Sequence, residues 1–206
     1  MSVGLSCQET HGYWLLAMHC RRSALVLACS LAVEYESGPF KVESEGERQP
    51  MTIVPAHTSE QIEWARNLFL DYANELNVDL CFQNFAAELE ELPGKYAPPD
   101  GALLLAMNDQ HAVGCVALRR WSATDAEMKR LYIQPSYRQL GLGRVLTGCI
   151  VERARELSYR RVVLDTLDSM QGAQALYRSL GFASIEPYYD NPLPGASYFA
   201  RDLILP

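Results

Sequence analysis

The segment from Leu131 to Arg144 carries the pattern of a phosphate-binding turn. An apolar run ends at Pro135, and Arg138 to Gly143 (Arg-Gln-Leu-Gly-Leu-Gly) then leads into an amphipathic stretch. This order predicts a strand, a turn and a helix. The first turn of a helix has backbone N–H groups without intrahelical partners, and the helix dipole adds partial positive charge there. Because two glycines would let this backbone approach an anion closely, the segment predicts a phosphate site.

Two common phosphate motifs are excluded at this turn. Arg144, Val145 and Leu146 follow Gly143, so the turn is not a Gly-x-Gly-x-x-Gly dinucleotide fingerprint. No Gly-Lys-Ser or Gly-Lys-Thr ending is present, which argues against a Walker-type loop.

Two flanking segments narrow the interpretation. Ala126 to Ile133 (Ala-Glu-Met-Lys-Arg-Leu-Tyr-Ile) precedes the turn, and Ala173 to Phe182 follows it and ends in Tyr-x-x-Leu-Gly-Phe. Together with Arg-x-x-Gly-x-Gly after a strand closed by x-Pro, these segments resemble the GNAT acetyltransferase superfamily over roughly residues 51–205. The resemblance implies the α/β (α+β) class, with a GNAT-type mixed, mostly antiparallel central sheet flanked by helices. It also implies acetyl-CoA as the acetyl donor.

The resemblance assigns a coenzyme site. In the family, backbone amides of the turn hold the pyrophosphate, and N–H groups of the preceding strand pair with the pantetheine arm. The implied residues are Leu131, Tyr132, Ile133, Arg138, Gln139, Leu140, Gly141, Leu142, Gly143 and Arg144. We expect Arg138 to stabilise the turn and Arg144 to face the phosphates, although either arginine could lie on a solvated face. Family members often carry an asparagine where this chain has Met170, which receives no coenzyme role.

Acetyl transfer to an amine needs a deprotonated nitrogen, a polarised carbonyl and a proton for the leaving thiolate. Glu127 matches a position where some family members carry a carboxylate general base, acting directly or through water; it could equally form a surface ion pair. Tyr177 matches the tyrosine that many members use as a general acid, and a phenol stays protonated at neutral pH. Strand alternation predicts that Glu127, Lys129, Leu131 and Ile133 share one face, and that Met128, Arg130 and Tyr132 share the other.

Acceptor recognition in this fold falls to the first-helix region and the last-strand loops. The candidates in this chain are Phe82, Tyr96, Tyr188, Tyr189, Asp190 and Asn191. Asp190 beside two tyrosines could hold an ammonium group through charge and cation–π attraction. Asp-Asn-Pro is also a common turn-forming string, so both interpretations stay open.

The expected elements give these residues a scaffold. Thr58 and Gln61 form a capping box for a helix from about Ser59 to Asn77, and Cys81 to Leu92 predicts a second helix. Helices are also predicted from Gly143 to about Ser158 and over Gln171–Leu180. The predicted strands are Thr52–Ala56, Ala102–Met107, Ala112–Trp121, the strand containing Glu127, Arg161–Thr166, Ala183–Glu186 and Ser197–Leu205.

Composition sets outer limits on function. The chain has 206 residues, 49% of them hydrophobic, and a net charge of −7. That charge disfavours a general nucleic-acid or anionic-membrane binder, suits a cytoplasmic enzyme, and mildly favours a cationic substrate such as an amine. The six cysteines contain no Cys-x-x-Cys pair, so no metal site is expected, and Cys81, Cys115 and Cys149 are predicted to be reduced core residues.

The first fifty residues follow a different pattern. The apolar stretch from Ser23 to Val33 is about half the ~20 residues that a membrane-spanning helix needs. Val26 to Cys29 forms an imperfect lipobox, and residues 34–50 have the composition of a polar linker. The favoured interpretation is a dispensable extension over residues 1–50 and one GNAT domain over residues 51–206, with a lipidated signal segment as the alternative.

The sequence therefore predicts an acetyl-CoA-dependent N-acetyltransferase. Direct transfer to a primary amine of a small-molecule or amino-acid-like acceptor is the first hypothesis. A protein acetyltransferase acting on a lysine or an N-terminus is the second, and a non-catalytic acyl-CoA sensor is the third. The expected partner is a small-molecule amine, with no nucleic acid and no membrane, and a homodimer is left open.

Overall fold

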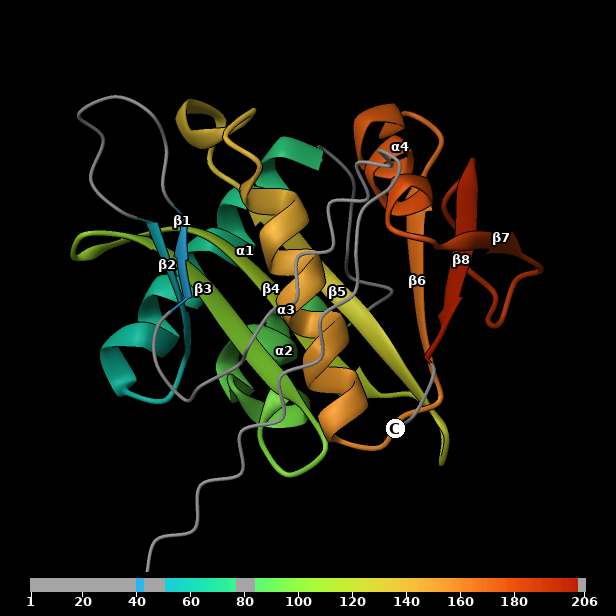
Figure 1. Ribbon diagram of the computed structural model, residues 1–206, viewed down its shortest axis with the longest axis horizontal. Helices are drawn as coiled ribbons and strands as arrows, with labels where there is room; N and C mark the ends of the chain where they lie inside the picture. Colours follow the sequence, from blue (N-terminus) through green and yellow to red (C-terminus); the bar gives the residue numbers. More distant parts are fainter. Residues whose placement is uncertain (1–39, 43–50, 77–83, 204–206) are drawn as a thin grey trace, which may run out of the picture. The chain divides into compact units, whose positions relative to one another are not determined.

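The computed structural model describes residues 40–42, 51–76 and 84–203. These residues form an eight-stranded sheet in the order β1-β2-β3-β4-β5-β6-β8-β7 (Figure 1). The strands are β1 (Phe40–Val42), β2 (Met51–Pro55), β3 (Ala102–Asn108), β4 (His111–Arg120), β5 (Asp125–Ile133), β6 (Arg161–Leu167), β7 (Ala183–Ile185) and β8 (Ala196–Asp202). The α-helices are α1 (Ser59–Leu76), α2 (Phe85–Glu91), α3 (Leu142–Glu156) and α4 (Gln171–Ser179).

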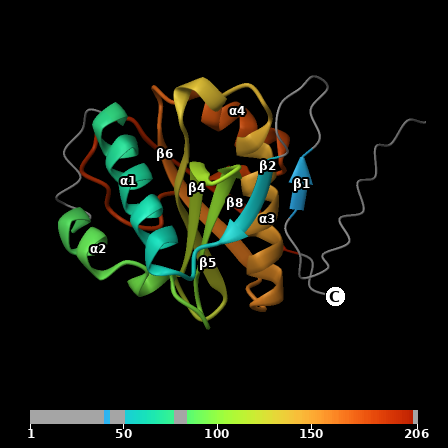
Figure 2. The same ribbon diagram turned by 90° about the vertical axis from the view of Figure 1, so that its left-hand side faces the viewer.

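The helices cover both faces of the sheet. α1 and α2 lie on one face, and α3 and α4 lie on the other, as the two views at right angles show (Figures 1 and 2). Leu68 and Phe69 of α1 pack into one apolar cluster, while Leu146 and Ile150 of α3 pack into a second. Residues of β3, β4 and β5 contribute to both clusters, so the middle strands are buried on each side.

Local sequence explains where the first helix begins. The backbone N–H of Gln61 donates to the Thr58 hydroxyl, and the Gln61 side chain accepts from the backbone N–H of Thr58. This reciprocal pair is the predicted capping box, and it satisfies N–H groups that the helix leaves unpaired. Ile62, Ala65, Leu68 and Phe69 then recur at helical spacing and are buried against the sheet.

The sheet opens between β5 and β6. Every recorded strand pair is antiparallel except this one, whose parallel register runs only from Asp125–Arg161 to Glu127–Val163. Beyond Glu127, β5 stays paired with β4 while β6 follows β8. The two central strands therefore separate, and the free edge of β5 carries backbone groups that need other partners.

A β-bulge in β5 overturns the predicted alternation. Cys115 pairs with Tyr132 and Ala117 with Lys129, so two residues of β5, Arg130 and Leu131, oppose one residue of β4, and Arg130 has a φ of +58°. Because of the extra residue, the side chains after the bulge point to the sheet faces opposite to those that strict alternation predicts. Glu127, Lys129, Arg130 and Tyr132 lie on the α1–α2 side, whereas Met128, Leu131 and Ile133 lie on the α3–α4 side.

The fold class and the order of the predicted elements are confirmed from β2 to β8. Phe40–Val42 forms strand β1 on β2, inside the segment interpreted as a linker. Cys115 is free and buried, and Cys149 is free and half-buried beside the core. Cys81, Phe82 and the proposed lipobox lie outside the described residues. Over the described ranges, no helix combines the length and apolar character required to cross a bilayer.

Candidate active site

A large groove begins at the N-terminus of α3. Its volume is about 810 Å³. It runs between α1 and α4, along the end of β5 and the turn that follows. Its lining includes every residue of the predicted coenzyme site except Leu140: Leu131, Tyr132, Ile133, Arg138, Gln139, Gly141, Leu142, Gly143 and Arg144. The structure thus brings the strand end and the glycine turn together in one groove.

The turn presents its backbone to the groove. Gln139 and Gly141 have φ values of +64° and +80°, and Gly141 is the N-cap of α3. A Cβ added at Gly141 would meet nothing within 4 Å, so the space above the helix N-terminus is open. At Gly143 the same atom would lie 3.3 Å from a methyl group of Leu176, so glycine permits close packing of α3 on α4. No acidic residue lies in the first turn of α3, which leaves its positive end available to an anion.

The two arginines of the turn have different contacts. Arg138 donates from Nε to the Ile133 carbonyl (3.0 Å) and from Nη2 to the Glu75 carboxylate (2.5 Å), so it ties the turn to β5 and α1. Arg144 donates to the Ser179 hydroxyl at the end of α4 (2.7 Å) and lines the groove. Both side chains are exposed, and both contribute positive charge where phosphates would bind.

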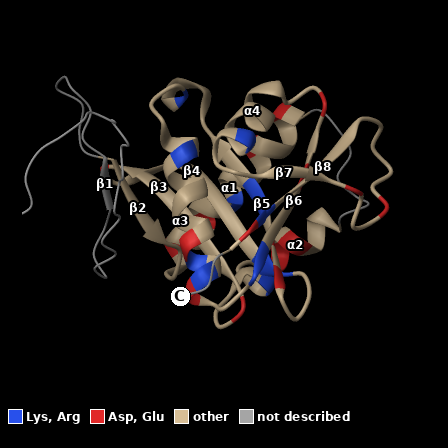
Figure 3. Cartoon of the chain, turned by 45° about the vertical axis from the view of Figure 1, so that its right-hand side comes forward, with Lys and Arg blue, Asp and Glu red and all other residues tan. Residues whose placement is uncertain are grey.

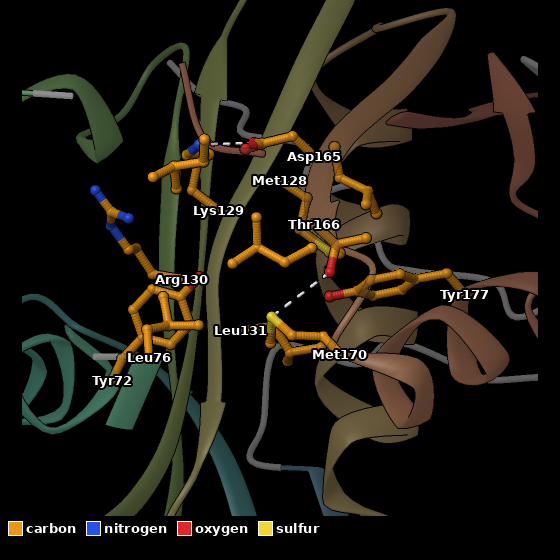
Figure 4. A pocket seen from close by; sticks show the side chains of 13 residues that line it. Tyr72, Leu76, Met128, Lys129, Arg130, Leu131, Asp165, Thr166, Met170 and Tyr177 are labelled. Carbon is orange, nitrogen blue, oxygen red and sulfur yellow. Dashed lines mark hydrogen bonds and ion pairs between the residues drawn. The ribbon is translucent and has the colours of Figure 1, made fainter. Parts of the chain in front are cut away.

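A narrow cavity of about 40 Å³ lies beside the groove, in the gap between β5 and β6. Tyr72, Leu76, Leu131 and Met170 line both spaces, which makes them neighbours. Figure 4 shows Tyr177 pointing from α4 toward Leu131 across this gap. Burial raises the pKa of the Tyr177 phenol, and nearby Tyr72 and Asp165 add to the effect, so the hydroxyl stays protonated throughout the neutral range.

Glu127 is fully buried and does not line the cavity. Its carboxylate accepts hydrogen bonds from Arg119 Nε and, at 2.9 Å, from the Tyr188 hydroxyl. Lys129 Nζ lies 3.8 Å from the same carboxylate. A buried charge is tolerated only with such partners. The ion pair considered as the alternative for Glu127 is therefore present, but its carboxylate is buried and does not lie on the surface.

Lys129 and Asp165 form an ion pair that spans the gap. Lys129 Nζ on β5 and Asp165 Oδ1 on β6 are 2.8 Å apart, and both residues line the cavity (Figure 4). The Tyr189 hydroxyl (2.8 Å) and Asn191 Nδ2 (3.1 Å) donate to the other Asp165 oxygen. Burial alone would raise the pKa of Asp165, but the Lys129 charge and these hydrogen bonds outweigh it and lower that pKa.

The predicted acceptor residues separate into distinct environments. Tyr188, Tyr189 and Asn191 reach the carboxylates of the site, and their loop also forms a shallow hollow on the outside. Asp190 is exposed and lines only that hollow among the described cavities. Tyr96 is buried, and its hydroxyl donates to Glu88 of α2 (2.9 Å). Phe82 lies outside the described residues.

A second ion cluster supports the bulge. The guanidinium of Arg130 donates to both oxygens of Glu88 (2.8 and 3.2 Å), and Lys95 Nζ lies 2.7 Å from the same carboxylate. The Phe85 and Tyr72 rings flank Arg130 at 5.0 and 5.8 Å. A positive φ at a non-glycine residue costs of order 1–3 kcal/mol, so these contacts hold Arg130 in its strained conformation. Figure 3 shows basic and acidic segments adjoining around β5 and α2.

Sequence reasoning missed Lys129, Asp165, Arg119 and Glu88. A signal existed for Asp165, since it is a charged residue that follows the apolar run Val162 to Leu164 of its strand. Such residues are rarely buried without a partner, but the sequence alone does not show which partner each one has.

The comparisons with known proteins agree with this geometry. Residues 62–182 match the acetyltransferase (GNAT) family model. An uncharacterized N-acetyltransferase of Schizosaccharomyces pombe is 42% identical over 139 residues, which cover 66% of this chain and 85% of the relative. A GNAT-family acetyltransferase from Staphylococcus aureus superposes with a TM-score of 0.64 at 24% identity, covering 75% of this chain and 99% of the other.

A further solved structure, the PaiA N-acetyltransferase of Thermoplasma acidophilum in complex with coenzyme A, has the same fold. Its TM-score is 0.59 at 16% identity, and the match covers 74% of this chain and 99% of that one. The family match spans more than half of the chain, from α1 to the end of the Tyr-x-x-Leu-Gly-Phe segment. The chain belongs to the GNAT acetyltransferase family.

Proposed function

We propose that this chain transfers the acetyl group of acetyl-CoA directly to the primary amine of a small molecule or an amino-acid-like acceptor. The observation that carries the proposal is that the two cavities adjoin. The groove at the α3 N-terminus shares four lining residues with the cavity in the β5–β6 gap, which Tyr177 and the Lys129–Asp165 pair line (Figure 4).

The groove has the chemistry that a coenzyme A molecule requires. Its outer end offers free helix N–H groups, open space at Gly141 and the side chains of Arg138 and Arg144 for phosphates. Its inner end offers the unpaired edge of β5, whose backbone groups can bond the amides of an extended pantetheine arm. Residues Leu131 to Ile133 are at that edge and line the groove.

Bound acetyl-CoA supplies a thioester, and transfer forms a carbon–nitrogen bond to the amine while the carbon–sulfur bond breaks and the thiol is released. In this proposal Tyr177 donates its phenolic proton to the departing sulfur, a role for which its raised pKa keeps it protonated. Tyr177 lines the cavity in the β5–β6 gap together with Leu131 and Met170, which also line the groove.

Glu127 acts indirectly in this scheme. Because its side chain is fully buried and already bonded to Arg119 and Tyr188, we assign proton uptake from the amine to a relay. The Tyr188 hydroxyl, or a water beside it, accepts the amine proton as its own proton passes to the Glu127 carboxylate. The acceptor then lies between the 186–191 loop and the bulge of β5.

The test is a screen of primary amines with the purified full-length chain and acetyl-CoA, following free thiol and confirming the N-acetyl product by mass spectrometry. Amine-dependent thiol release that requires Tyr177 supports the proposal. Coenzyme A binding without transfer to any small amine contradicts it. In that case, transfer to peptide N-termini or lysines would identify a protein acetyltransferase, and no transfer at all would identify a sensor.

A further inference from the structure

The charged groups around the β5–β6 gap have an excess of positive charge. Lys129, Arg130 and Asp165 line the cavity. Their direct ion partners, and the partners of those, complete a cluster of four cations and three carboxylates: Lys95, Arg119, Lys129 and Arg130 against Glu88, Glu127 and Asp165. The whole chain carries a net charge of −7, so this cluster has the opposite sign from the molecule that surrounds it.

Most of these charges are already fully engaged. Arg130 donates two hydrogen bonds to Glu88, and only 2% of each side chain is exposed. Glu127 is held by Arg119 and Tyr188. The Lys129–Asp165 pair differs, because it lines the cavity and the two side chains come from strands that are no longer paired with each other. A ligand that enters the gap can therefore break this ion pair and replace it with its own contacts to Lys129 and Asp165.

Asp165 can take part in that exchange without losing its position. Tyr189 and Asn191 hold one of its oxygens from the loop, so the other oxygen can leave Lys129 and still belong to an anchored carboxylate. Lys129 has three ammonium donors on a flexible stem, of which Asp165 Oδ1 takes one at 2.8 Å. A zwitterion that enters here replaces the Lys129–Asp165 pair with two ion pairs, one between its ammonium and Asp165 and one between its carboxylate and Lys129.

We propose that the acceptor is an amine with a carboxylate on the neighbouring carbon, as in an α-amino acid, and that Lys129 binds this carboxylate. The inference rests on the proposed acetyl transfer and names its substrate class. Asp165 receives the ammonium as the acceptor enters, and the carboxylate pairs with Lys129. The zwitterion as a whole adds no net charge to a cluster that already has one cation in excess, and its carboxylate gives Lys129 a new partner.

Other amines fit this cluster less well. A simple alkylamine enters as a cation and adds positive charge where it is already in excess, and it leaves Lys129 without a new partner. A peptide N-terminus or an amino-acid amide offers a neutral carbonyl where the amino acid offers a carboxylate. Lys129 is therefore a specificity-determining residue that distinguishes free amino acids from both classes.

Matched acceptors test the proposal on the wild-type chain. Each L-amino acid is compared with its amide and with its decarboxylated amine, by thiol release with acetyl-CoA. We expect kcat/KM at least about tenfold higher for the amino acids, equivalent to one lost charge-assisted contact. Equal or better use of the amines or amides overturns the proposal while leaving acetyl transfer intact. No amine-dependent thiol release from any member counts against acetyl transfer itself, and this proposal falls with it.

Lys129→Met then links the preference to the side chain. We expect it to raise KM for the amino acid roughly tenfold or more while KM for the matched amine stays within about twofold, and we expect Lys129→Arg to restore most of the preference. Arg153→Met, which removes an exposed cation of α3, is the control. Coenzyme A affinity reports whether each variant is folded. If Lys129→Met does not fold, the comparison of matched acceptors on the wild-type chain tests the proposed substrate class. An unchanged preference in a folded Lys129→Met chain overturns the role of Lys129.

Discussion

The proposed donor end and the proposed acceptor end of the site are built in different ways. The donor end is one contiguous turn, residues 138–144, whose exposed backbone faces a wide groove. The acceptor end joins side chains from β4, β5, β6 and the 186–191 loop in a buried network of ion pairs. Coenzyme binding therefore depends on local backbone geometry, whereas acceptor binding depends on contacts between residues far apart in the sequence.

This difference predicts which changes act on which substrate. A backbone cradle recognises a group that is the same in every reaction of this type, so a short pattern suffices to build it. A network of buried charges recognises a particular acceptor, because each charge must be matched by the ligand or by a neighbour. Tyr177, the proposed proton donor, lines the β5–β6 gap next to residues that also line the groove.

The largest effect is expected at Tyr177. Tyr177→Phe removes the proposed proton donor and should lower kcat by roughly 100- to 10,000-fold, with little change in acetyl-CoA affinity. Pre-steady-state thiol release and coenzyme titration measure the two quantities. Tyr159→Phe is the matched control, because the Tyr159 hydroxyl donates to the Asp100 carbonyl away from both cavities. An unchanged kcat in Tyr177→Phe would remove the tyrosine from the mechanism.

The next effect concerns the stability of the ion cluster that supports the β5 bulge. Glu88→Gln leaves Arg130 with a buried, poorly compensated charge and should lower the free energy of unfolding by about 3 kcal/mol in urea titrations. Burial alone would raise the pKa of Glu88, but Arg130 first and Lys95 second lower it from 4.5 to about 2. Glu156→Gln, which breaks a half-exposed pair on α3, is the control and should cost about 1 kcal/mol or less.

The lowered pKa also fixes a pH window. The folded protein holds the Glu88 carboxylate more strongly deprotonated than the unfolded chain does. The stabilisation is therefore complete above about pH 4.5 and is lost as the pH falls toward 2. The gap in unfolding free energy between wild type and Glu88→Gln should shrink across that interval. A gap that stays constant down to pH 2 would show that Glu88 is not the titrating group.

A smaller effect is expected at the donor end. Gly141→Ala places a Cβ at a φ of +80°, which costs about 1–2 kcal/mol in the turn and should weaken coenzyme A binding roughly tenfold. Gly148→Ala is the matched control, since Gly148 lies inside α3 and an added Cβ there meets nothing within 4 Å. Calorimetry on both variants compares them. Equal affinities would mean that the conformation of Gly141 does not govern binding.

The smallest effect is expected at Asp190. The sequence proposes this residue as an ammonium ligand, but in the structure it is exposed on the outer hollow while Glu127 and Asp165 occupy the buried positions. Asp190→Asn should change KM for the acceptor by no more than about twofold, as expected for an exposed charge. A tenfold rise in KM would place the acceptor against the outer hollow.

The turn and the start of α3 could be predicted almost completely from the sequence, because the pattern and the structure occupy the same few residues. Helix caps and strand order were predictable for the same reason, as Thr58 and Gln61 illustrate. The acceptor end could be predicted only in part. The bulge at Arg130 changes which sheet face the side chains of Leu131 to Ile133 occupy. Arg130 is held there by Glu88 of α2, which lies 42 residues away in the sequence.

The same limit applies to the roles of the carboxylates. The position of Glu127 suggested a base, but its burial and its bonds to Arg119 and Tyr188 depend on β4 and on a loop 61 residues further along. Asp165 stands out in the sequence as a charge in an apolar strand, but only the structure shows that its partner is Lys129, 36 residues earlier. Long-range ion pairs leave no periodic signal in the sequence, so their partners must be read from the structure.

One crossed measurement tests the separation of the two ends most directly. Gly141→Ala, Lys129→Met and the double variant are assayed for KM of acetyl-CoA and KM of the preferred acceptor. We predict that Gly141→Ala raises only the KM of acetyl-CoA and that Lys129→Met raises only the KM of the acceptor. In the double variant the two changes should add in free energy. If Lys129→Met weakened acetyl-CoA and left the acceptor unaffected, the assignment of the buried ion network to acceptor binding would be contradicted.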